Sequence, residues 1–365
     1  MNGAGAWAGA GDLAVERQRL APGVARPLVT IVVNNHNYGA YLRDAIDSAL
    51  TQHYRPLEVV VVDDGSTDDS RAIIASYGDR VVPVLKPRGG QASTFSAGLE
   101  RSTGSIVLFL DADDALLPTA IEDVVAAWRP GVAKVQFRYA FMGADGRDLG
   151  VVYPGGELPS GDLRDWVVEH GRYPSPGTCG NAFARSVLDA ILPIADCRSP
   201  DGYLVLASAL LGEVVSLDRV LCRVRVHGDN AWSMDRFSVE RVRDYALHDV
   251  ENERLLRPFA AQRGMTLPAR WTLRSAGHVQ ARVASLKLAP AEHPFPNDGM
   301  ARLVVGGLGA FWRAPQAPLR RRLLGATWLL LVAMLPRSLA RPLIEWSYQP
   351  AQRPAVFNRL LGRRR

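Results

Sequence analysis

The chain has 365 residues, of which 47% are hydrophobic and 22% are charged, a balance typical of a folded globular protein rather than a disordered one. The formal net charge of +6 is concentrated at one end, because residues 320–365 hold ten Arg and one Glu, whereas residues 1–319 sum to −3. This distribution argues against a nucleic-acid-binding role for the body of the protein and indicates a separate partner for the basic end.

The start of the chain and the cysteines both bear on the cellular compartment. Residues 1–27 are rich in Gly and Ala and lack the basic start and long apolar core of a secretory signal peptide, so we expect a disordered leader. The three cysteines, Cys179, Cys197 and Cys222, show no CxxC spacing, which predicts neither a disulfide framework nor a zinc site. A reducing, cytoplasmic location fits both features.

Between residues 28 and 111, apolar runs alternate with segments of helical periodicity. Strands are predicted at 28–34, 57–64, 80–85 and 105–111, and helices at 39–52, 66–78 and 90–104. Strands separated by helices of this length form βαβ units, which predicts an α/β fold with a Rossmann-like, mostly parallel sheet and helices on both faces. In such sheets the ligand binds at the carboxyl ends of the strands.

Polar side chains follow three of these predicted strands at the point where each strand ends. Asn34 ends the first, Asp63 and Asp64 end the second, and the run 111–114 ends the fourth. Because the carboxyl ends of parallel strands share one edge of the sheet, we expect these side chains to converge on one crevice.

The fourth strand, "SIVLFLD", runs into three carboxylates, Asp111, Asp113 and Asp114. Carboxylates this close repel one another unless a positive charge lies among them, and Asp-x-Asp suits Mg²⁺ or Mn²⁺ with positions left open for phosphates. A haloacid-dehalogenase-type phosphatase needs Thr or Val where Ala115 stands, and the residues that follow do not alternate oxygen ligands as a calcium loop does.

After residue 118 the pattern changes. The segments 134–142 and 148–154 flank a turn-rich link and predict a hairpin. A Gly-rich loop then enters a helix over 175–192, a second helix covers 200–212, and 214–230 alternates like a strand up to His227.

From residue 236 to 365 the sequence predicts an Arg-rich helical region broken by prolines. Its uncharged run, 323–335, would rise about 20 Å as a helix, short of the roughly 30 Å hydrocarbon core of a bilayer. Flanking Arg residues with Trp328 and Trp346 favour a helix lying on an anionic membrane surface, and burial in a protein core is the alternative. We therefore predict peripheral attachment at the inner face of the plasma membrane.

Two stretches of the chain carry a family resemblance. "VTIVVNNHNYGAYLRDAIDSALTQHYRPLEVVVVDDGSTDDS" and "GGQASTFSAGLERSTGSIVLFLDADDALLP" resemble the family 2 glycosyltransferases, which have the GT-A fold, and the likeness extends over roughly 28–230. The resemblance implies a glycosyltransferase domain at 28–235. It also implies an inverting enzyme that moves a sugar, a hexose or a related one, from a nucleotide-diphosphate donor to an acceptor hydroxyl with Mg²⁺ or Mn²⁺.

Matching the family motifs residue by residue implies a donor site. Asp64 matches the acid that binds the nucleobase, and Asn34 lies where the first strand contacts the nucleotide. Asp111 and Asp113 match the metal-binding Asp-x-Asp, where Asp111 also faces the donor, and Asp114 matches a residue that positions the sugar.

Four later positions complete the implied site. Asp201 matches the catalytic base, and His227 matches a histidine that completes the metal and phosphate site. Gly180 and Asn181 match a donor-binding loop that faces both substrates. One departure from the family pattern is Pro200, which precedes Asp201 where an acid is common.

The resemblance implies a role in making a cell-surface polysaccharide, glycolipid or glycan, with a sugar, lipid-linked or protein acceptor. Two alternatives stay open. One is a catalytically silent homologue that binds a nucleotide-sugar and acts as an assembly partner. The other is a sugar nucleotidyltransferase, although that class needs a Gly-rich loop with a basic residue where this chain has "NNHNYGAY".

Overall fold

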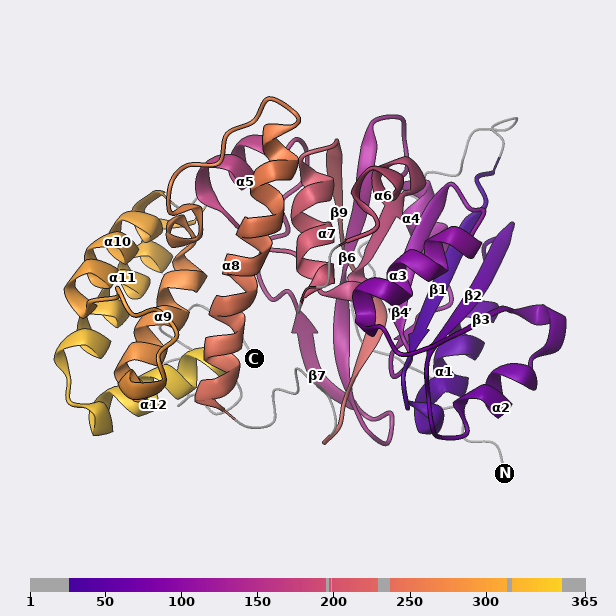
Figure 1. Cartoon of the computed structure of the whole chain (residues 1–365), viewed down its shortest axis with the longest axis horizontal. Helices are drawn as coiled ribbons and strands as arrows, with labels where there is room; N and C mark the ends of the chain where they lie inside the picture. Colours follow the sequence, from indigo (N-terminus) through magenta and orange to yellow (C-terminus); the bar gives the residue numbers. More distant parts are fainter. Residues whose placement is uncertain (1–25, 195–196, 198, 229–236, 314–316, 350–365) are drawn as a thin grey trace.

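A computed structural model describes residues 26–194, 197, 199–228, 237–313 and 317–349 (Figure 1). The leader predicted for 1–27 lies outside the described residues except for its last two positions. The predicted boundary at 235/236 also lies outside them.

The first half of the sheet is parallel. Its strands lie in the order β3-β2-β1-β4, and each neighbouring pair is parallel. The strands are β1 (Val29–Asn35), β2 (Leu57–Asp64), β3 (Val82–Lys86) and β4 (Ile106–Asp111). The predicted α/β class is confirmed, and β3, which contains Pro83, is the edge strand that the proline predicted.

Helices cover both faces of this sheet because each carries one apolar stripe. They are α1 (Gly39–Leu50), α2 (Ser70–Ala75) and α3 (Gly90–Arg101). In α1 the buried stripe runs through Leu42, Ile46 and Ala49, as the periodicity predicted, and it joins the core on one face together with α2. Phe95 and Leu99 of α3 belong to the core on the opposite face.

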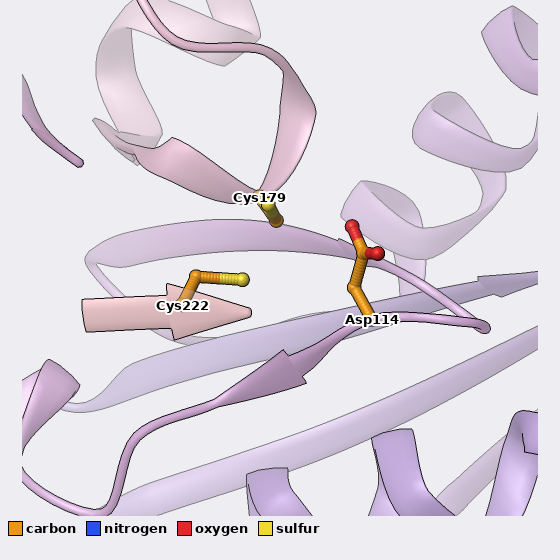
Figure 2. A group of neighbouring side chains, drawn as sticks. All are labelled: Asp114, Cys179 and Cys222. Carbon is orange, nitrogen blue, oxygen red and sulfur yellow. The ribbon is translucent and has the colours of Figure 1, made fainter. Parts of the chain in front are cut away.

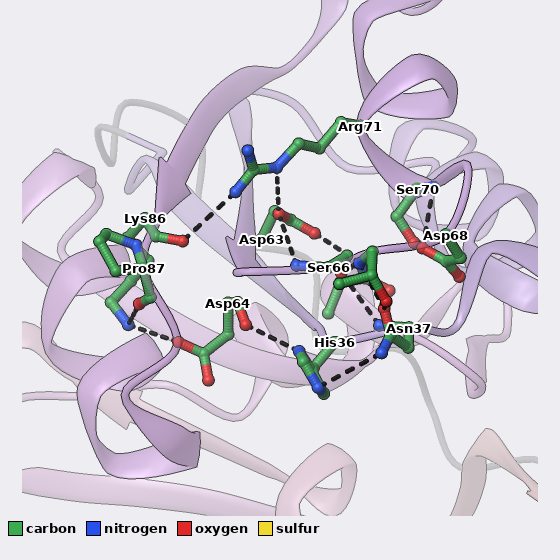
Figure 3. Close-up of polar contacts among 12 residues, drawn as sticks. His36, Asn37, Asp63, Asp64, Ser66, Asp68, Ser70, Arg71, Lys86 and Pro87 are labelled. Carbon is green, nitrogen blue, oxygen red and sulfur yellow. Dashed lines mark hydrogen bonds and ion pairs between the residues drawn. The ribbon is translucent and has the colours of Figure 1, made fainter.

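The helix predicted at 66–78 is shorter than its pattern, since α2 begins at Ser70. Ser66 and Thr67, which the sequence of 66–78 predicts as N-cap candidates, do not cap it, because Asp69 stands at the N-cap position. The Ser66 hydroxyl instead accepts from the Asn37 amide at 2.9 Å, and the Asp68 carboxylate accepts from the backbone N–H of Ser70 at 3.1 Å (Figure 3). The Ser66 hydroxyl, which could have capped the helix, is thus engaged by the residues that follow β1.

Beyond β4 the sheet becomes mixed. Strand β8 is antiparallel to β4 and β6, β6 is parallel to β9, and β5 and β7 add antiparallel pairs. These strands are β5 (Ala115–Leu116), β6 (Val132–Gly143), β7 (Asp148–Tyr153), β8 (Asn181–Ala184) and β9 (Glu213–Val226). The predicted hairpin is present as β6–β7, whereas β8 falls inside the predicted loop and helix of 175–192. Ala182 and Phe183 form a strand there because β4 and β6 supply ladder partners on both sides.

Short helices connect these strands. They are α4 (Ala120–Ala126), α5 (Arg164–His170), α6 (Arg185–Ile191), α7 (Pro200–Ala209) and the 3₁₀ turns η1 (Gly78–Arg80) and η2 (Thr178–Gly180). All of α7 except Asp201 is buried, and it lies in the same core as α3.

The C-terminal region is helical, as predicted, but it is not a detached appendage. Its elements are α8 (Val239–Ala261), η3 (Trp271–Arg274), α9 (Ala276–Leu288), η4 (Pro290–Glu292), α10 (Met300–Arg313), α11 (Leu319–Met334) and α12 (Arg337–Tyr348). Helix α8 is shared between two cores, because Leu256 and Phe259 pack with α3 and α7 whereas Val242 and Ala246 pack with α9–α12. It stands between the sheet and the other C-terminal helices in Figure 1.

Helix α11, which contains most of the uncharged run, is buried along one face and exposed along the other. Leu329 and Val332 are buried among α9–α12, whereas Leu323 and Met334 face outward with 50% and 81% of their surface exposed. Among the described helices, none is long and apolar enough to cross a membrane.

Candidate active site

A cavity of about 640 Å³ opens at the carboxyl ends of β1, β2 and β4. Its remaining walls come from the β6–β7 hairpin, the loop at 172–179, the beginning of α7 and the inner face of α8. Among the described residues, the cavity lining includes every strand-end group that the sequence singled out except Asp63: Asn34, Asp64, Asp111, Asp113 and Asp114, together with Asp201.

The side chain of Asn34 is buried without a hydrogen-bond partner. Within the part of the chain that the structure describes, both its amide nitrogen and its amide oxygen lack a partner, and the residue is only 8% exposed, at the cavity wall. A buried polar group left unpaired costs about 1–3 kcal/mol, so such an amide points to a ligand that completes it. In the sheet Asn34 lies beside Asp111, which places the amide next to the carboxylate cluster.

The two adjacent acids at the end of β2, Asp63 and Asp64, have different roles. Asp63 is buried and accepts from Asn35, the Ser66 backbone and Arg71. Burial by itself raises the pKa of Asp63, but these hydrogen bonds outweigh it and the pKa is lowered. Asp63 therefore has a structural role, because it ties β2 to β1 and α2 (Figure 3).

Asp64 lines the cavity and anchors the beginning of α3. Its carboxylate pairs with Lys86 and accepts from the backbone N–H groups of Gly89 and Gly90, each at 2.8 Å. Its own carbonyl accepts from Nδ1 of His36 at 2.7 Å (Figure 3). Because a carbonyl oxygen can only accept, this contact places the proton on Nδ1 of His36.

Asp111 lies half-buried in the cavity with two other carboxylates near it. Burial, and then the charges of Asp113 and Asp201, raise the pKa of Asp111 to about 7. Gln91 donates to it at 3.3 Å. Asp201, the predicted base, thus lies close enough for its charge to act on Asp111, although the two are 90 residues apart in sequence.

Asp113 and His227 meet inside the protein. Nε2 of His227 lies 3.1 Å from Oδ2 of Asp113, and both side chains are almost fully buried. The His227 ring packs edge-on against Tyr38 and lies 4.8 Å from the ring of Tyr41. Among the described residues, His227 is not one that lines the cavity, so it reaches the site through Asp113.

Asp114 contacts the cavity but is held from behind. It accepts from the Arg225 backbone N–H at 3.0 Å and lies beside Cys179 and Cys222, with the three ligand atoms within 4.8 Å of one another (Figure 2). Burial, then Asp113 and Asp111, keep the pKa of Asp114 well above its usual range, and burial also raises the pKa of both thiols. The Arg225 hydrogen bond and the two neighbouring thiols hold Asp114 in place.

Asp111 and Asp113 offer the carboxylate oxygens that Mg²⁺ and Mn²⁺ prefer, and His227 would add one imidazole nitrogen. Burial and then the carboxylates of Asp113 and Asp201 raise the pKa of Asp111, and a cation bound among them would favour its ionised form. Among the described residues, the ligand atoms of Asp114, Cys179 and Cys222 lie within 4.8 Å of one another, whereas those of the three predicted ligands do not all lie that close together.

Gly180 and Asn181 lie behind the cavity wall, and among the described residues neither lines the cavity. The Asn181 oxygen accepts from Lys134 at 2.6 Å, and its amide donates to the carbonyl of Gly177 at 2.7 Å. A Cβ atom at Gly180 would lie 2.4 Å from the Cβ of Pro176, so the tight packing there requires glycine. Both residues shape the loop at 175–179, which does line the cavity.

Arg225 is a site residue that sequence reasoning missed. It is buried, donates from Nε to the Asp113 carbonyl at 3.0 Å and from Nη2 to Asp44 at 2.7 Å, and its guanidinium lies 4.7 Å from the centre of the Tyr41 ring. The sequence could have indicated it, because Arg225 lies two residues before His227, and residues i and i+2 of a strand lie on the same face.

A second buried network joins the cavity to the C-terminal helices. Arg172 donates to Asp249 at 2.7 Å, and Nδ1 of His278 lies 3.2 Å from the other oxygen of Asp249. Burial raises the pKa of Asp249, but the Arg172 charge and the hydrogen bonds from His278 and Arg172 prevail and lower it from its ordinary 3.8. Asp249 on α8 thus links the loop before the cavity to α9.

We expect Asp249→Ala to destabilise the protein by about 3–5 kcal/mol at pH 7, since it leaves a buried charge unpaired. A lowered folded-state pKa stabilises at pH values above the unfolded pKa, near 3.8, and this stabilisation is lost as pH falls through the folded pKa. Urea unfolding should be measured at pH 7 and in steps below pH 4. The difference in the free energy of unfolding between wild type and variant should become smaller as the pH falls. Glu100→Ala, at an exposed position on α3, is the control, and a gap independent of pH would contradict the assignment.

The fold and the site together define an α/β protein whose ligand pocket lies at the carboxyl edge of its parallel strands and is lined by carboxylates. Residues 30–190 match the model of the family described as Glycosyl transferase family 2. The predicted resemblance is confirmed over this segment.

Two relatives illustrate the similarity. An uncharacterized glycosyltransferase of Nostoc sp. is 32% identical over 211 residues, which cover 55% of this chain and 66% of the relative. An uncharacterized glycosyltransferase of Rickettsia prowazekii is 41% identical over 96 residues, 26% of this chain and 30% of the relative. The chain thus matches less than two thirds of the length of each.

Among solved structures, the chain is similar to a mannosyltransferase from Pyrobaculum calidifontis in complex with GDP-Man and Mn²⁺. The identity is 21% and the TM-score is 0.49, with 93% of this chain and 89% of that chain covered. It is also similar to residues 1–349 of TarS from S. aureus in complex with UDP-GlcNAc, at 14% identity and a TM-score of 0.47, covering 88% and 92% of the two chains.

Proposed function

We propose that this protein is an inverting glycosyltransferase that moves a sugar from a nucleotide-diphosphate donor to an acceptor hydroxyl. The observation that carries the proposal is the convergence of Asp111, Asp113 and Asp201 in one cavity beside the unpartnered amide of Asn34. A cell-surface polysaccharide, glycolipid or glycan is the product that we infer.

On the donor side, the Asn34 amide is placed to complete its hydrogen bonds with the nucleotide, and Asp64 lies in the same wall for the nucleobase. Asp111 and Asp113, with His227 behind them, are the residues that would hold Mg²⁺ or Mn²⁺. When bound, such an ion would neutralise charge on the leaving diphosphate. Asp114, in the same wall, is assigned to position the transferred sugar.

Asp201 is assigned as the general base. It lies at the beginning of α7, where the Ser199 hydroxyl donates to its Oδ1 at 2.8 Å and orients the carboxylate. In this role it takes the proton from the acceptor hydroxyl as that oxygen attacks the anomeric carbon from the face opposite the diphosphate. One displacement inverts the anomeric centre, so no carboxylate nucleophile is required.

A screen of nucleotide-sugars with Mn²⁺, read by thermal stabilisation and by release of nucleoside diphosphate, tests the proposal. We expect at least one donor to stabilise the protein and to be turned over slowly by water. Release of pyrophosphate from a nucleoside triphosphate would instead favour a nucleotidyltransferase. Donor binding without turnover, across a broad panel of acceptors, would favour the catalytically silent homologue.

We also propose that the C-terminal helices attach the protein to an anionic membrane surface. Leu319, Leu323, Met334 and Leu339 are between 50% and 81% exposed on α11 and α12. Exposed arginines flank them: Arg320, Arg321, Arg337 and Arg341. Apolar side chains beside cations are typical of helices that lie at a lipid interface.

Replacing two of these arginines should weaken attachment, because each Arg near an anionic surface contributes about 1 kcal/mol. The variant R320Q/R321Q should bind vesicles containing phosphatidylglycerol about 10- to 30-fold less tightly in a sedimentation assay at low salt. The control R43Q/R101Q removes two exposed arginines from the sheet domain and should bind as wild type does. Equal binding of wild type to neutral and anionic vesicles, or no binding to either, would reject the idea.

A further inference from the structure

One wall of the cavity is aromatic, in contrast to the wall that carries the carboxylates. It contains Tyr139 and Phe141 from β6, Tyr153 from β7 and Tyr245 from α8. We propose that this aromatic wall is the acceptor subsite and that it binds a neutral sugar ring, so that the acceptor is a saccharide. The inference rests on the proposed glycosyl transfer, because it names the substrate that the second half of the cavity receives.

The hairpin part of the wall is preorganised. The rings of Tyr139 and Tyr153 are stacked, with centroids 5.4 Å apart and an angle of 30° between planes. Phe141 meets Tyr139 edge-on at 5.4 Å. Tyr139 is 9% exposed and Tyr153 is 40% exposed, so a buried ring supports one that remains open to a ligand.

Helix α8 supplies the other part of the wall. Tyr245 and His248 are three residues apart, so they lie on one face of α8, and both line the cavity. The Arg172 guanidinium lies 5.1 Å from the centre of the Tyr245 ring. Arg172, Tyr153 and Tyr245 all line this cavity, so the hairpin and α8 contribute to the same chamber.

The charge of this end of the cavity favours a neutral ligand. Arg172 lines this end of the cavity and could attract a phosphate or carboxylate, but its guanidinium is already paired with the buried carboxylate of Asp249 at 2.7 Å. What the wall offers is ring faces bordered by the hydroxyl groups of tyrosines and by His248. The C–H face of a sugar covers such rings while its hydroxyl groups reach the polar edges, whereas a lipid chain would bury those edges unpaired.

The position of the wall also suits an acceptor. Helix α7 presents Asp201, Gly202 and Val205 along the same cavity, and the Tyr173 hydroxyl donates to the Val205 carbonyl at 3.0 Å, which fixes the aromatic side to α7. A ring bound on the wall would therefore lie in the same cavity as Asp201. The C-terminal helical region, through α8, becomes a part of substrate recognition.

The test uses the full chain and neutral probes, the methyl glycosides of glucose, galactose, mannose and N-acetylglucosamine. Saturation-transfer NMR, with Mn²⁺ omitted to avoid paramagnetic broadening, should show transfer to ring C–H protons of at least one glycoside. Tyr153→Ala should weaken that binding about 3- to 10-fold, the value of one aromatic contact, whereas Tyr153→Phe should retain most of it. Leu149→Ala, at an exposed position on the same strand that is not one of the described lining residues, should change nothing.

Nucleoside diphosphate binding is measured separately on the same variants and should stay within twofold. A failure of the proposed function would appear as loss of nucleotide binding in wild type, whereas a failure of this inference would leave that binding intact. Absence of any glycoside contact, binding of sugar phosphates alone, preference for a polyprenyl chain, or unchanged glycoside affinity in Tyr153→Ala would each overturn the saccharide assignment.

Discussion

Asp201→Asn should abolish sugar transfer while leaving donor binding unchanged. The amide has the shape of the carboxylate and can still accept from Ser199, 2.8 Å away in the wild type, but it cannot take a proton from the acceptor. Loss of a general base lowers turnover by about 10²–10⁴-fold. The measurements are the initial rate at saturating donor and the dissociation constant of the nucleoside diphosphate.

The competing interpretation is that Asp201 is only a helix N-terminal acid. In that case its replacement would cost about 0.3–1 kcal/mol of stability and leave the rate unchanged. Asp189→Asn, at an exposed helical position away from the described cavity walls, controls for the loss of one carboxylate. Turnover of Asp201→Asn equal to that of the control would remove Asp201 from the mechanism.

Asp113→Asn should separate stability from function. Asp113 raises the pKa of both Asp111 and Asp114, so removing its charge relieves repulsion in the metal-free protein. We expect its free energy of unfolding to be equal to or greater than that of wild type, while Mn²⁺-dependent donor binding falls by about 100-fold or more. Thermal unfolding without metal and donor titration with Mn²⁺ measure the two effects.

A purely structural role for Asp113, as the partner of His227 at 3.1 Å, predicts the opposite sign. The variant would then be less stable and would bind the donor normally once folded. Asp165→Asn, an exposed position on α5, should leave both quantities at the wild-type values.

The local pattern of the chain was enough to predict the first half of the sheet and one edge of the cavity. Apolar residues repeat every two positions in a strand and every 3.6 in a helix, and both patterns can be recognised from neighbouring residues alone. The ends of β1, β2 and β4 could therefore be located without any tertiary information. The rule that parallel strands share a carboxyl edge then brought Asn34, Asp64 and Asp111 together. Each of these steps depends on short-range sequence or on a general property of βαβ units.

Other features depend on partners far away in the chain. The strand β8 exists because β4 and β6 flank it, and the capping role expected of Ser66 was displaced by contacts with the end of β1. Arg225 reaches Asp113, 112 residues earlier, through a buried hydrogen bond that no local pattern encodes.

The chain's own periodicity and its carboxylates thus determined the class of fold and the chemistry of the donor edge, because both arise from local spacing. Tertiary packing decided which side chains face the cavity. Asn181 turned away to hold Lys134, and Tyr245 of the C-terminal region turned inward beside Tyr153. The docking of α8 against α7 sets these orientations, and burial of the α8 core residues at this junction supplies the free energy for it.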